Sequence, residues 1–385
     1  MSEDRFETLA IHAGQEPDPT TGAAVVPIYA TSTYVQQAPG VHKGYEYSRT
    51  DNPTRTALQT QIAALEGVGP GVGAPGGAVA TSSGLAATAL VGHLLTPGDH
   101  MVLPDDAYGG TFRLVARVLA DHGIEWTACD LTDRDALAAS MRPTTKVVWV
   151  ETPTNPMLRV VDIRSVVAAA HASDALVVVD NTFATPYLQQ PLDLGADIVL
   201  HSATKYLGGH SDTVAGVLVT GDDDLLERLR FLQNAVGPIL GPFDSYLVLR
   251  GLKTLGVRMD RHCANALAVA RFLDADSRVE TVWYPGLPSH PGHGVAENQM
   301  SGFGGMVSFT PVGGVDAAND IVTQTRLFFL GESLGGVESL IEVPAVMTHA
   351  SVVGTDLEVP EALVRCSVGI EHIDDLLSDL DRALG

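Results

Sequence analysis

The chain has few cysteines, few basic residues and no long hydrophobic run. Only three cysteines, Cys129, Cys263 and Cys366, occur among 385 residues. Such a sparse and odd-numbered set predicts neither a disulfide framework nor a zinc ribbon, and it favours a reducing, cytoplasmic compartment. The first seven residues, Met-Ser-Glu-Asp-Arg-Phe-Glu, contain no basic and no apolar region, so we expect no secretory signal. No apolar run approaches the length of a membrane span.

The scarcity of basic residues excludes further classes of protein. Lysine and arginine number 23 against 46 acidic residues, which gives a formal net charge of −23. A free-standing nucleic-acid binder would carry the opposite sign, and an anionic membrane surface would repel this chain. We therefore expect neither partner, and any bound phosphate must be held by a few local groups. Hydrophobic residues make up 45% of the chain, which excludes a mostly disordered protein.

Strand and helix patterns alternate from residue 78 to about residue 221. The expected strands are short, continuous and β-branched, as in parallel sheets that are buried on both faces. We expect strands at 100–103, 146–151, 175–180, 198–201 and 214–220, with helices at 84–95, 111–121 and 162–172 between them. The alternation predicts an α/β fold with a mostly parallel sheet.

The flanking segments suggest how the chain is divided. Residues 1–55 are rich in proline, glycine and threonine and predict an irregular N-terminal arm. Asn52 and Pro53 are typical of a helix start, and Gly67 of a helix end. We expect a large domain over 56–245 and a smaller C-terminal domain over 246–385, joined by a helical stretch at 244–275 and closed by an amphipathic last helix.

Reactive side chains follow the expected strands, at the sheet edge where parallel α/β folds bind ligands. Lys205 comes after one strand, preceded by Ser202 and Thr204, and Asp180 ends another. A lysine in this place can form a Schiff base beside a phosphate, and an aspartate can hold a protonated pyridine nitrogen. Taken singly, Lys205 would suit a solvated surface lysine and Asp180 a strand-end cap.

Two further features fit the same ligand. Tyr108 follows the strand at 100–103 and can stack on an aromatic ring. Gly84 and Leu85 open a helix, whose free amides and positive dipole end can receive a phosphate. Together with the lysine and the aspartate, these residues predict pyridoxal phosphate as the cofactor. His290 and His293 enclose a Pro-Gly turn and suit surface histidines better than a metal site, so no metal is expected.

Six motifs in one order carry a family resemblance. They are Tyr47-Ser-Arg49-Thr-Asp-Asn-Pro-Thr54, Glu151-Thr-Pro-Thr-Asn-Pro156, Asp180-Asn-Thr-Phe183, His201-Ser-Ala-Thr-Lys-Tyr206, Glu332-Ser-Leu-Gly-Gly-Val-Glu-Ser339 and Arg365-Cys-Ser-Val-Gly369. The sequence resembles, nearly end to end, the Cys/Met-metabolism family of pyridoxal-phosphate enzymes. The resemblance implies fold type I, with a mostly parallel seven-stranded sheet in the large, cofactor-binding domain and a smaller C-terminal α+β domain. It also implies a homotetramer, a dimer of dimers in which residues 1–55 contact the neighbouring subunit and active sites are shared.

The resemblance also assigns roles to individual residues. Lys205 would hold the cofactor and move protons, Asp180 would pair with the ring nitrogen, and Tyr108 would stack on the ring; these three are the expected catalytic residues. The phosphate would be held by Gly84, Leu85, Ser202 and Thr204, and by Tyr47 and Arg49 of the neighbouring subunit. The amino-acid substrate would be bound by Asn155, Ser333, Arg365 and Glu332.

Within the family the sequence favours γ-elimination. The expected reaction converts L-cystathionine into cysteine, 2-oxobutyrate and ammonia. The alternatives are γ-replacement of an acylated homoserine by cysteine (γ-synthase), methionine γ-lyase, and an enzyme for a specialised γ-substituted amino acid. Gly110 stands where methionine γ-lyases typically have cysteine, and Glu332 where β-lyases tend to have an aromatic residue. A β-lyase or aminotransferase would yield another keto acid, and a non-catalytic binding or regulatory protein would not need Lys205.

Overall fold

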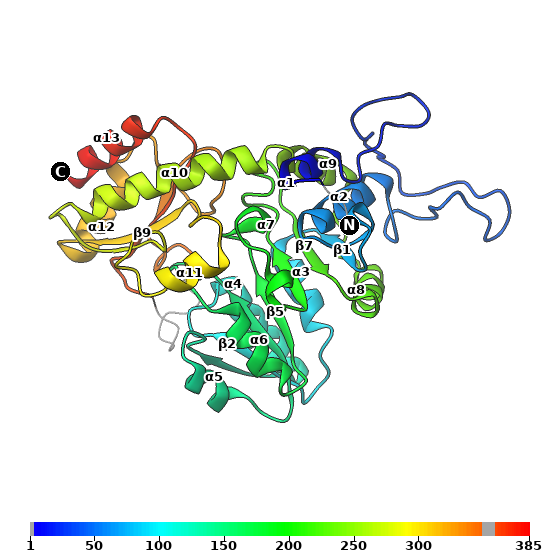
Figure 1. Ribbon diagram of the computed structural model, residues 1–385, viewed down its shortest axis with the longest axis horizontal. Coiled ribbons are helices and arrows are strands. Elements are labelled where there is room, and N and C mark those ends of the chain that lie inside the picture. The colour runs from blue at the N-terminus through cyan, green and yellow to red at the C-terminus, as the bar shows by residue number, and fades with distance from the viewer. Residues whose placement is uncertain (1–3, 349–358) are drawn as a thin grey trace. The chain divides into compact units, whose positions relative to one another are not determined.

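The computed structural model describes residues 4–348 and 359–385, in two compact units. The first unit comprises residues 4–94 and 197–256, and the second comprises residues 95–196 together with the rest of the chain from residue 257. Figure 1 shows the elements by label and colour.

The large sheet has seven strands in the described chain, in the order β1-β7-β6-β5-β4-β2-β3. Parallel pairings join β2 to β3, β2 to β4 and β4 to β5, whereas β7 pairs antiparallel with both β1 and β6. The expected α/β class with a large, mostly parallel sheet is thereby confirmed. The bounds are β1 Gly77–Thr81, β2 His100–Pro104, β3 Glu125–Cys129, β4 Thr145–Glu151, β5 Leu176–Asp180, β6 Ile198–His201 and β7 Gly216–Thr220.

The first unit places its helices around β1, β7 and β6. These helices are α1 Phe6–His12, α2 Pro53–Leu65, α3 Gly84–Gly92, α8 Asp223–Val236 and α9 Pro242–Leu252. The predicted start of α2 is confirmed, because the Asn52 side chain accepts a hydrogen bond from the Thr54 N–H at 3.0 Å. The arm between α1 and α2 is almost without regular structure, and its blue loops extend away from α2 in Figure 1.

The second unit contains two hydrophobic cores. In its first part, residues of β2, β4 and β5 pack against α5 and α6, with Leu137, Val148 and Val166 almost fully buried. The helices here are α4 Gly109–Leu114, α5 Arg134–Ser140, α6 Ile163–His171 and α7 Thr185–Leu188. α4 continues through a π-turn at Val115–Leu119 and a 3₁₀ turn at Ala120–His122.

The second core of this unit lies in its C-terminal part. A five-stranded sheet runs in the order β10-β11-β12-β9-β8 and packs against α10, α12 and α13 (Figure 1). Leu376 and Leu380 of α13 are fully buried there, as the amphipathic pattern predicts. The bounds are α10 Leu255–Asp274, β8 Val279–Trp283, α11 His293–Gln299, β9 Met306–Pro311, α12 Gly314–Gln324, β10 Phe329–Leu330, β11 Leu340–Glu342, β12 Val364–Ser367 and α13 Ile373–Leu384.

Three details differ from the sequence-based expectations. The helical stretch expected at 244–275 is two helices, because the N–H and the hydroxyl of Thr254 both donate to the Gly251 carbonyl and close a tight turn. β1 was not expected, since Gly-Ala-Val-Ala-Thr has only weak strand propensity. β3 was not expected either, because it is a partly exposed edge strand with a mixed pattern.

Candidate active site

The first unit contains a site suited to an anion at the start of α3. Ser83 caps this nine-residue helix, and its hydroxyl accepts a hydrogen bond from the Ala86 N–H at 3.0 Å. The first amides of a helix have no partner within it and lie at the positive end of its dipole. A Cβ on Gly84 would lie 2.8 Å from the Cβ of Ser202, so the glycine permits Ser202 to lie directly against the helix start. The Ser202 hydroxyl and the helix amides therefore converge.

The loop after β6 fixes the position of Lys205. Its N–H donates to the Ser202 carbonyl at 3.1 Å, which closes a turn directly beyond the strand end. The Thr204 hydroxyl donates to the carbonyl of Ala215 at 3.1 Å and accepts from the N–H of the same residue at 3.0 Å. Thr204 thus ties the loop to the residue just before β7, and Lys205 is half-buried.

A buried hydrogen bond holds the end of the strand that precedes this loop. His201, the last residue of β6, has its Nε2 atom 2.6 Å from Oε1 of Glu66, the residue that ends α2. Both side chains are fully buried. Sequence reasoning missed this pair, because the two residues lie far apart in the chain and only the fold brings them together.

In the second unit, Asp180 and Glu151 end the neighbouring parallel strands β5 and β4 in register. The Asp180 carboxylate accepts hydrogen bonds from the N–H of Thr182 at 3.1 Å and from its hydroxyl at 2.5 Å. The Glu151 carboxyl accepts from the N–H of Tyr108 at 3.0 Å and of Asn155 at 2.8 Å. Burial, and then the charge of Asp180, raise the pKa of Glu151 well above its usual range.

Tyr108 presents its ring at the surface of the second unit. The side chain is 40% exposed, and partial burial raises the pKa of its hydroxyl. The ring lies against Gly110, where an added Cβ would come within 2.4 Å of the Tyr108 Cε1 atom. The absence of a side chain at Gly110 therefore permits this ring position. Glu332 is exposed, and its charge is among those that raise the pKa of Tyr108.

Arg365, on β12, is held by three groups of the second unit. Its Nη1 donates to Oδ1 of Asn155 at 2.8 Å, and its Nη2 donates to the Ser333 carbonyl at 2.8 Å. Ser333 has a left-handed backbone (φ 88°), which is uncommon for a residue with a side chain. Glu342 of β11 lies 3.0 Å from Nη2, and both charged side chains are buried. The guanidinium is thus fixed in one orientation.

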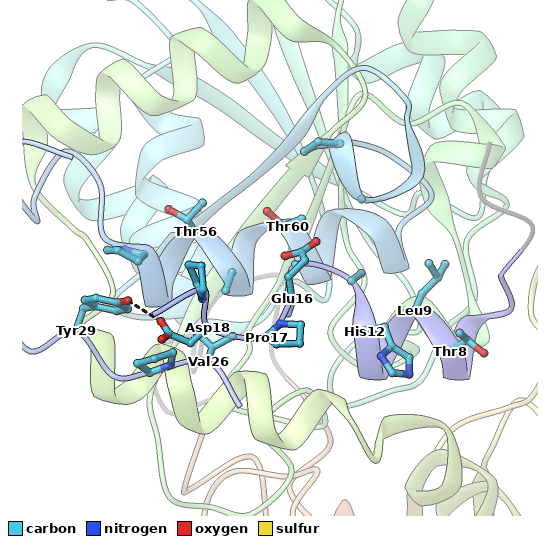
Figure 2. A pocket seen from close by; sticks show the side chains of 18 of the residues that line it. Thr8, Leu9, His12, Glu16, Pro17, Asp18, Val26, Tyr29, Thr56 and Thr60 are labelled. Carbon is cyan, nitrogen blue, oxygen red and sulfur yellow. Dashed lines mark hydrogen bonds between the residues drawn. The ribbon is translucent and has the colours of Figure 1, made fainter. Parts of the chain in front are cut away.

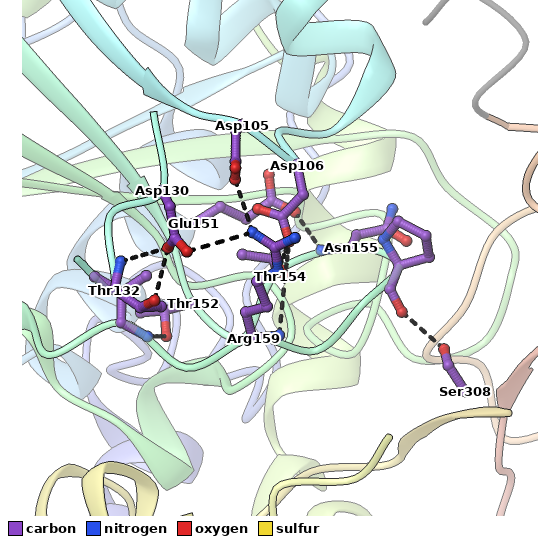
Figure 3. A network of polar contacts seen from close by, with 12 residues as sticks. Asp105, Asp106, Asp130, Thr132, Glu151, Thr152, Thr154, Asn155, Arg159 and Ser308 are labelled. Carbon is purple, nitrogen blue, oxygen red and sulfur yellow. Dashed lines mark hydrogen bonds and ion pairs between the residues drawn. The ribbon is translucent and has the colours of Figure 1, made fainter. Parts of the chain in front are cut away.

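A second polar network lies beside Glu151 (Figure 3). Asp106 is buried, and its carboxyl accepts from the Thr154 hydroxyl at 2.5 Å. Burial raises the pKa of Asp106 to about 6. Arg159 Nη1 donates to Asp105 at 2.8 Å, and its Nε lies 3.6 Å from Asp106. These contacts anchor the loop after β4 to the loop after β2.

Tyr47 and Arg49 lie on the surface of the first unit. Tyr47 is 45% exposed, and the Arg49 guanidinium carbon lies 5.5 Å from the centre of its ring. Arg49 Nε also donates to Asn234 of α8 at 3.2 Å. Their predicted role toward a neighbouring subunit stays a prediction.

The same unit has a surface hollow of about 690 Å³ among α1, α2 and the arm (Figure 2). His12, Asp18 and Thr60 are among its lining residues, and the Tyr29 hydroxyl donates to Asp18 there at 3.4 Å. Its described lining includes none of the predicted site residues.

The predicted residues therefore form two groups, one in each unit. Tyr47, Arg49, Gly84, Leu85, Ser202, Thr204 and Lys205 belong to the first unit, and Asp180, Tyr108, Asn155, Ser333, Arg365 and Glu332 belong to the second. Sequence reasoning gave no role to Glu151, Glu342 or Asp106. For Glu151 there was a usable signal, since an acidic residue ends the strand next to the one that ends in Asp180.

The donor set of these groups fits pyridoxal phosphate. The α3 amides and the Ser202 hydroxyl suit a phosphate, and the glycine at 84 leaves them room to converge. The Asp180 carboxylate suits a protonated ring nitrogen, and Lys205 suits the covalent linkage that this cofactor requires. Donors of these kinds are the ones that pyridoxal-phosphate-dependent α/β enzymes use.

Comparisons with known proteins give the family. The model of the family described as Cys/Met metabolism PLP-dependent enzyme matches residues 7–385. Cystathionine γ-synthase of Mycobacterium tuberculosis strain H37Rv is 56% identical over 395 residues, which cover all of both chains. Cystathionine β-lyase of Lactococcus lactis subsp. lactis is 54% identical over 98% of each chain. The crystal structure of metB from Corynebacterium glutamicum is 53% identical, with a TM-score of 0.96 over 99% of this chain and 98% of that one.

The chain belongs to this family of pyridoxal-phosphate-dependent enzymes of cysteine and methionine metabolism. The predicted family and cofactor are thereby confirmed. Over the described ranges, no helix is long and apolar enough to cross a membrane. Within the same ranges, no group of three or more histidine, cysteine or acidic residues is arranged to hold a metal ion.

Proposed function

We propose that the protein is a cystathionine γ-synthase, which replaces the γ-substituent of an acylated homoserine by the thiol of cysteine. The observation that carries the proposal is the 56% identity, over the full length of both chains, to relatives that bear this name. This choice differs from the γ-elimination that the motifs favoured, which remains the second candidate. The segments that begin at His12 and Phe183 support that second candidate, since they look closest to the γ-lyases of the family.

The side chains divide the work of this reaction. When bound, pyridoxal phosphate supplies the electron-withdrawing ring that acidifies the Cα–H bond of an amino acid. Lys205 Nζ takes the proton from Cα and returns protons later, which requires an amine pKa near neutrality. The Arg365 guanidinium binds the α-carboxylate, for which its planar fork is suited. Tyr108 would stack on the cofactor ring, and the Asp180 carboxylate would pair with the ring nitrogen.

The contacts of Arg365 support this role. Asn155, Ser333 and Glu342 hold the guanidinium in one place, so little side-chain freedom is left to lose when a carboxylate binds. Glu332 is exposed, and its charge raises the pKa of Tyr108. This position suits a contact with the distal part of the substrate.

A third activity also has a specific basis, because relatives named cystathionine β-lyase are 54% identical. Against it stands Glu332, where β-lyases of this family tend to have an aromatic residue. The products separate the three activities. γ-Replacement gives cystathionine and the free acid, γ-elimination gives 2-oxobutyrate, and β-elimination gives pyruvate and homocysteine.

We propose that the enzyme works in the cytoplasm as a homotetramer with shared sites. The arm supports contact between subunits, because its apolar residues Val25, Val35 and Val41 are 48%, 95% and 49% exposed in the isolated chain. Surfaces of this kind are typical of interfaces between protein chains. Mixing Arg49→Ala with Lys205→Ala subunits should then restore part of the activity. No recovery after proven subunit exchange would contradict the shared site.

The decisive experiment is a product assay on the purified holoenzyme. One reaction contains O-succinylhomoserine or O-acetylhomoserine with cysteine, the second contains either ester alone, and the third contains L-cystathionine. Cystathionine as the main product of the first reaction, and its absence with Lys205→Ala, would support the proposal. If 2-oxobutyrate is the main product of the third reaction, the enzyme is a γ-lyase and the proposal is wrong. If pyruvate is the main product, the enzyme is a β-lyase.

A further inference from the structure

Glu151 holds two functional residues at once. Each of its carboxyl oxygens accepts one hydrogen bond. Oε2 accepts from the N–H of Tyr108 at 3.0 Å, and Oε1 accepts from the N–H of Asn155 at 2.8 Å. The side chain is only 5% exposed. We propose that Glu151 is a positioning residue that sets the Tyr108 ring and the Asn155 amide together. This inference rests on the proposed function for the roles of those two residues.

The contacts continue from Asn155 to the substrate side of the second unit. The Asn155 amide oxygen accepts from Arg365 Nη1 at 2.8 Å, and Arg365 Nη2 donates to the Ser333 carbonyl at 2.8 Å. A shift of the Asn155 backbone would therefore move the group that orients the guanidinium. On the other side of Glu151, a shift of the Tyr108 backbone would move the ring that stacks on the cofactor. One buried side chain thus connects cofactor binding to carboxylate binding.

The chemistry of the two contacts requires two acceptors. A carboxyl group offers an acceptor oxygen to each N–H, in whichever protonation state it is present. The amide nitrogen of glutamine accepts no hydrogen bond, so Glu151→Gln places two N–H donors against each other at one of the two contacts. A buried N–H without an acceptor is costly, and the backbone at that contact is expected to move.

The surrounding loop has other anchors, which should leave the fold of a Glu151 variant in place. The Thr152 hydroxyl accepts from the N–H of Val161 at 3.0 Å, and Thr154 donates to Asp106 (Figure 3). The test compares three carboxyl-to-amide variants in the full chain, each a change of the same size. They are Glu151→Gln, Glu342→Gln and Asp379→Asn. In the native protein, Glu342 contacts Arg365 at Nη2, whereas Asn155 contacts it at Nη1. Asp379 accepts backbone N–H groups of residues 326–328 and serves as the matched control for stability alone.

Three quantities are measured for each variant. They are the Kd of pyridoxal phosphate for the apoprotein by fluorescence titration, the visible circular dichroism of the bound cofactor, and kcat and KM for the amino-acid substrate. We expect Glu151→Gln to weaken cofactor binding and to raise KM, each by about tenfold, and to change the dichroism. Glu342→Gln should raise KM only. Asp379→Asn should lower the melting temperature and change none of the three.

The proposal is overturned if Glu151→Gln behaves like Asp379→Asn, or if it alters only one of the two binding steps. If Glu151→Gln fails to fold, Glu151→Asp retains both acceptor oxygens at a shorter reach and should show the same double effect at smaller size. An unchanged Glu151→Asp would then count against the proposal. The cofactor titration needs no substrate, so it stays informative even if the proposed reaction is not found.

Discussion

The contact between Tyr108 and Gly110 leads to a sharp prediction for Gly110→Ala. A Cβ at this position would lie 2.4 Å from Cε1 and 3.0 Å from Cζ of the Tyr108 ring. Ordinary van der Waals contact begins at 3.4 Å, so the ring must withdraw by roughly 1 Å. Because the Tyr108 side chain is 40% exposed, we expect the ring to move toward solvent, away from its position in the wild type.

The size of the effect follows from what the ring contributes. An aromatic stack adds about 0.5–1.5 kcal/mol beyond its buried area. Loss of a stack of this size weakens cofactor binding by about two- to tenfold. Without the clash, an alanine in a helix would instead be more stable than glycine by about 0.5–1 kcal/mol. Gly110→Ala should therefore bind pyridoxal phosphate more weakly and gain no helix stability.

The assay is a titration of the apoprotein together with thermal unfolding. Gly294→Ala serves as the control, because Gly294 lies in α11 and a Cβ there would meet nothing within 4 Å. We expect the control to bind the cofactor like the wild type and to melt at an equal or higher temperature. A Gly110→Ala variant that behaves like this control would refute the account of the Tyr108 ring.

Three other changes test the packing around the site. Asn52→Ala removes a helix cap and should lower the free energy of unfolding by about 1 kcal/mol in a urea titration. Glu342→Ala removes the carboxylate that faces the buried Arg365 charge and should lower the free energy of unfolding by about 3–5 kcal/mol. A smaller loss would show that the remaining contacts of Arg365 compensate for its charge. The raised pKa of Asp106, about 6 against an ordinary 3.8, predicts that its ionisation destabilises the fold. Relative to Asp106→Asn, the free energy of unfolding of the wild type should fall by up to roughly 3 kcal/mol as the pH rises from about 4 to 6. Above about pH 6 the difference should stay constant. Parallel curves for the two proteins would contradict this.

The sequence predicts those parts of the fold in which local pattern and burial agree. β4 and β5 are rich in valine, and the periodic leucines of α13 mark its buried face. β1 could not be predicted in this way, because its small residues carry little strand preference and it pairs with β7, far along the chain. At the break between α9 and α10, the N–H and the hydroxyl of Thr254 both donate to the Gly251 carbonyl, and a periodic pattern shows neither contact.

For the candidate site, motifs located the residues but not the contacts that hold them. Arg365 was expected to bind the substrate, yet the burial of Glu342 beside it depends on the pairing of β11 with β12. Ser333 was expected to assist there, and its contact with Arg365 is made by the backbone carbonyl. Glu66 and His201 meet only because the fold brings the end of α2 to the end of β6. Such contacts depend on tertiary structure, so they cannot be recognised in a single sequence.

The central claim is that Lys205 carries the cofactor, and borohydride reduction of the holoenzyme tests it most directly. The reduction fixes a lysine-linked pyridoxal phosphate as a stable amine, which mass spectrometry of a digest can locate. The chain has four lysines, at positions 43, 146, 205 and 253, so the assignment is unambiguous. We predict one label per chain, on the peptide that contains Lys205. A label on another lysine, or none on a yellow protein, would contradict the account.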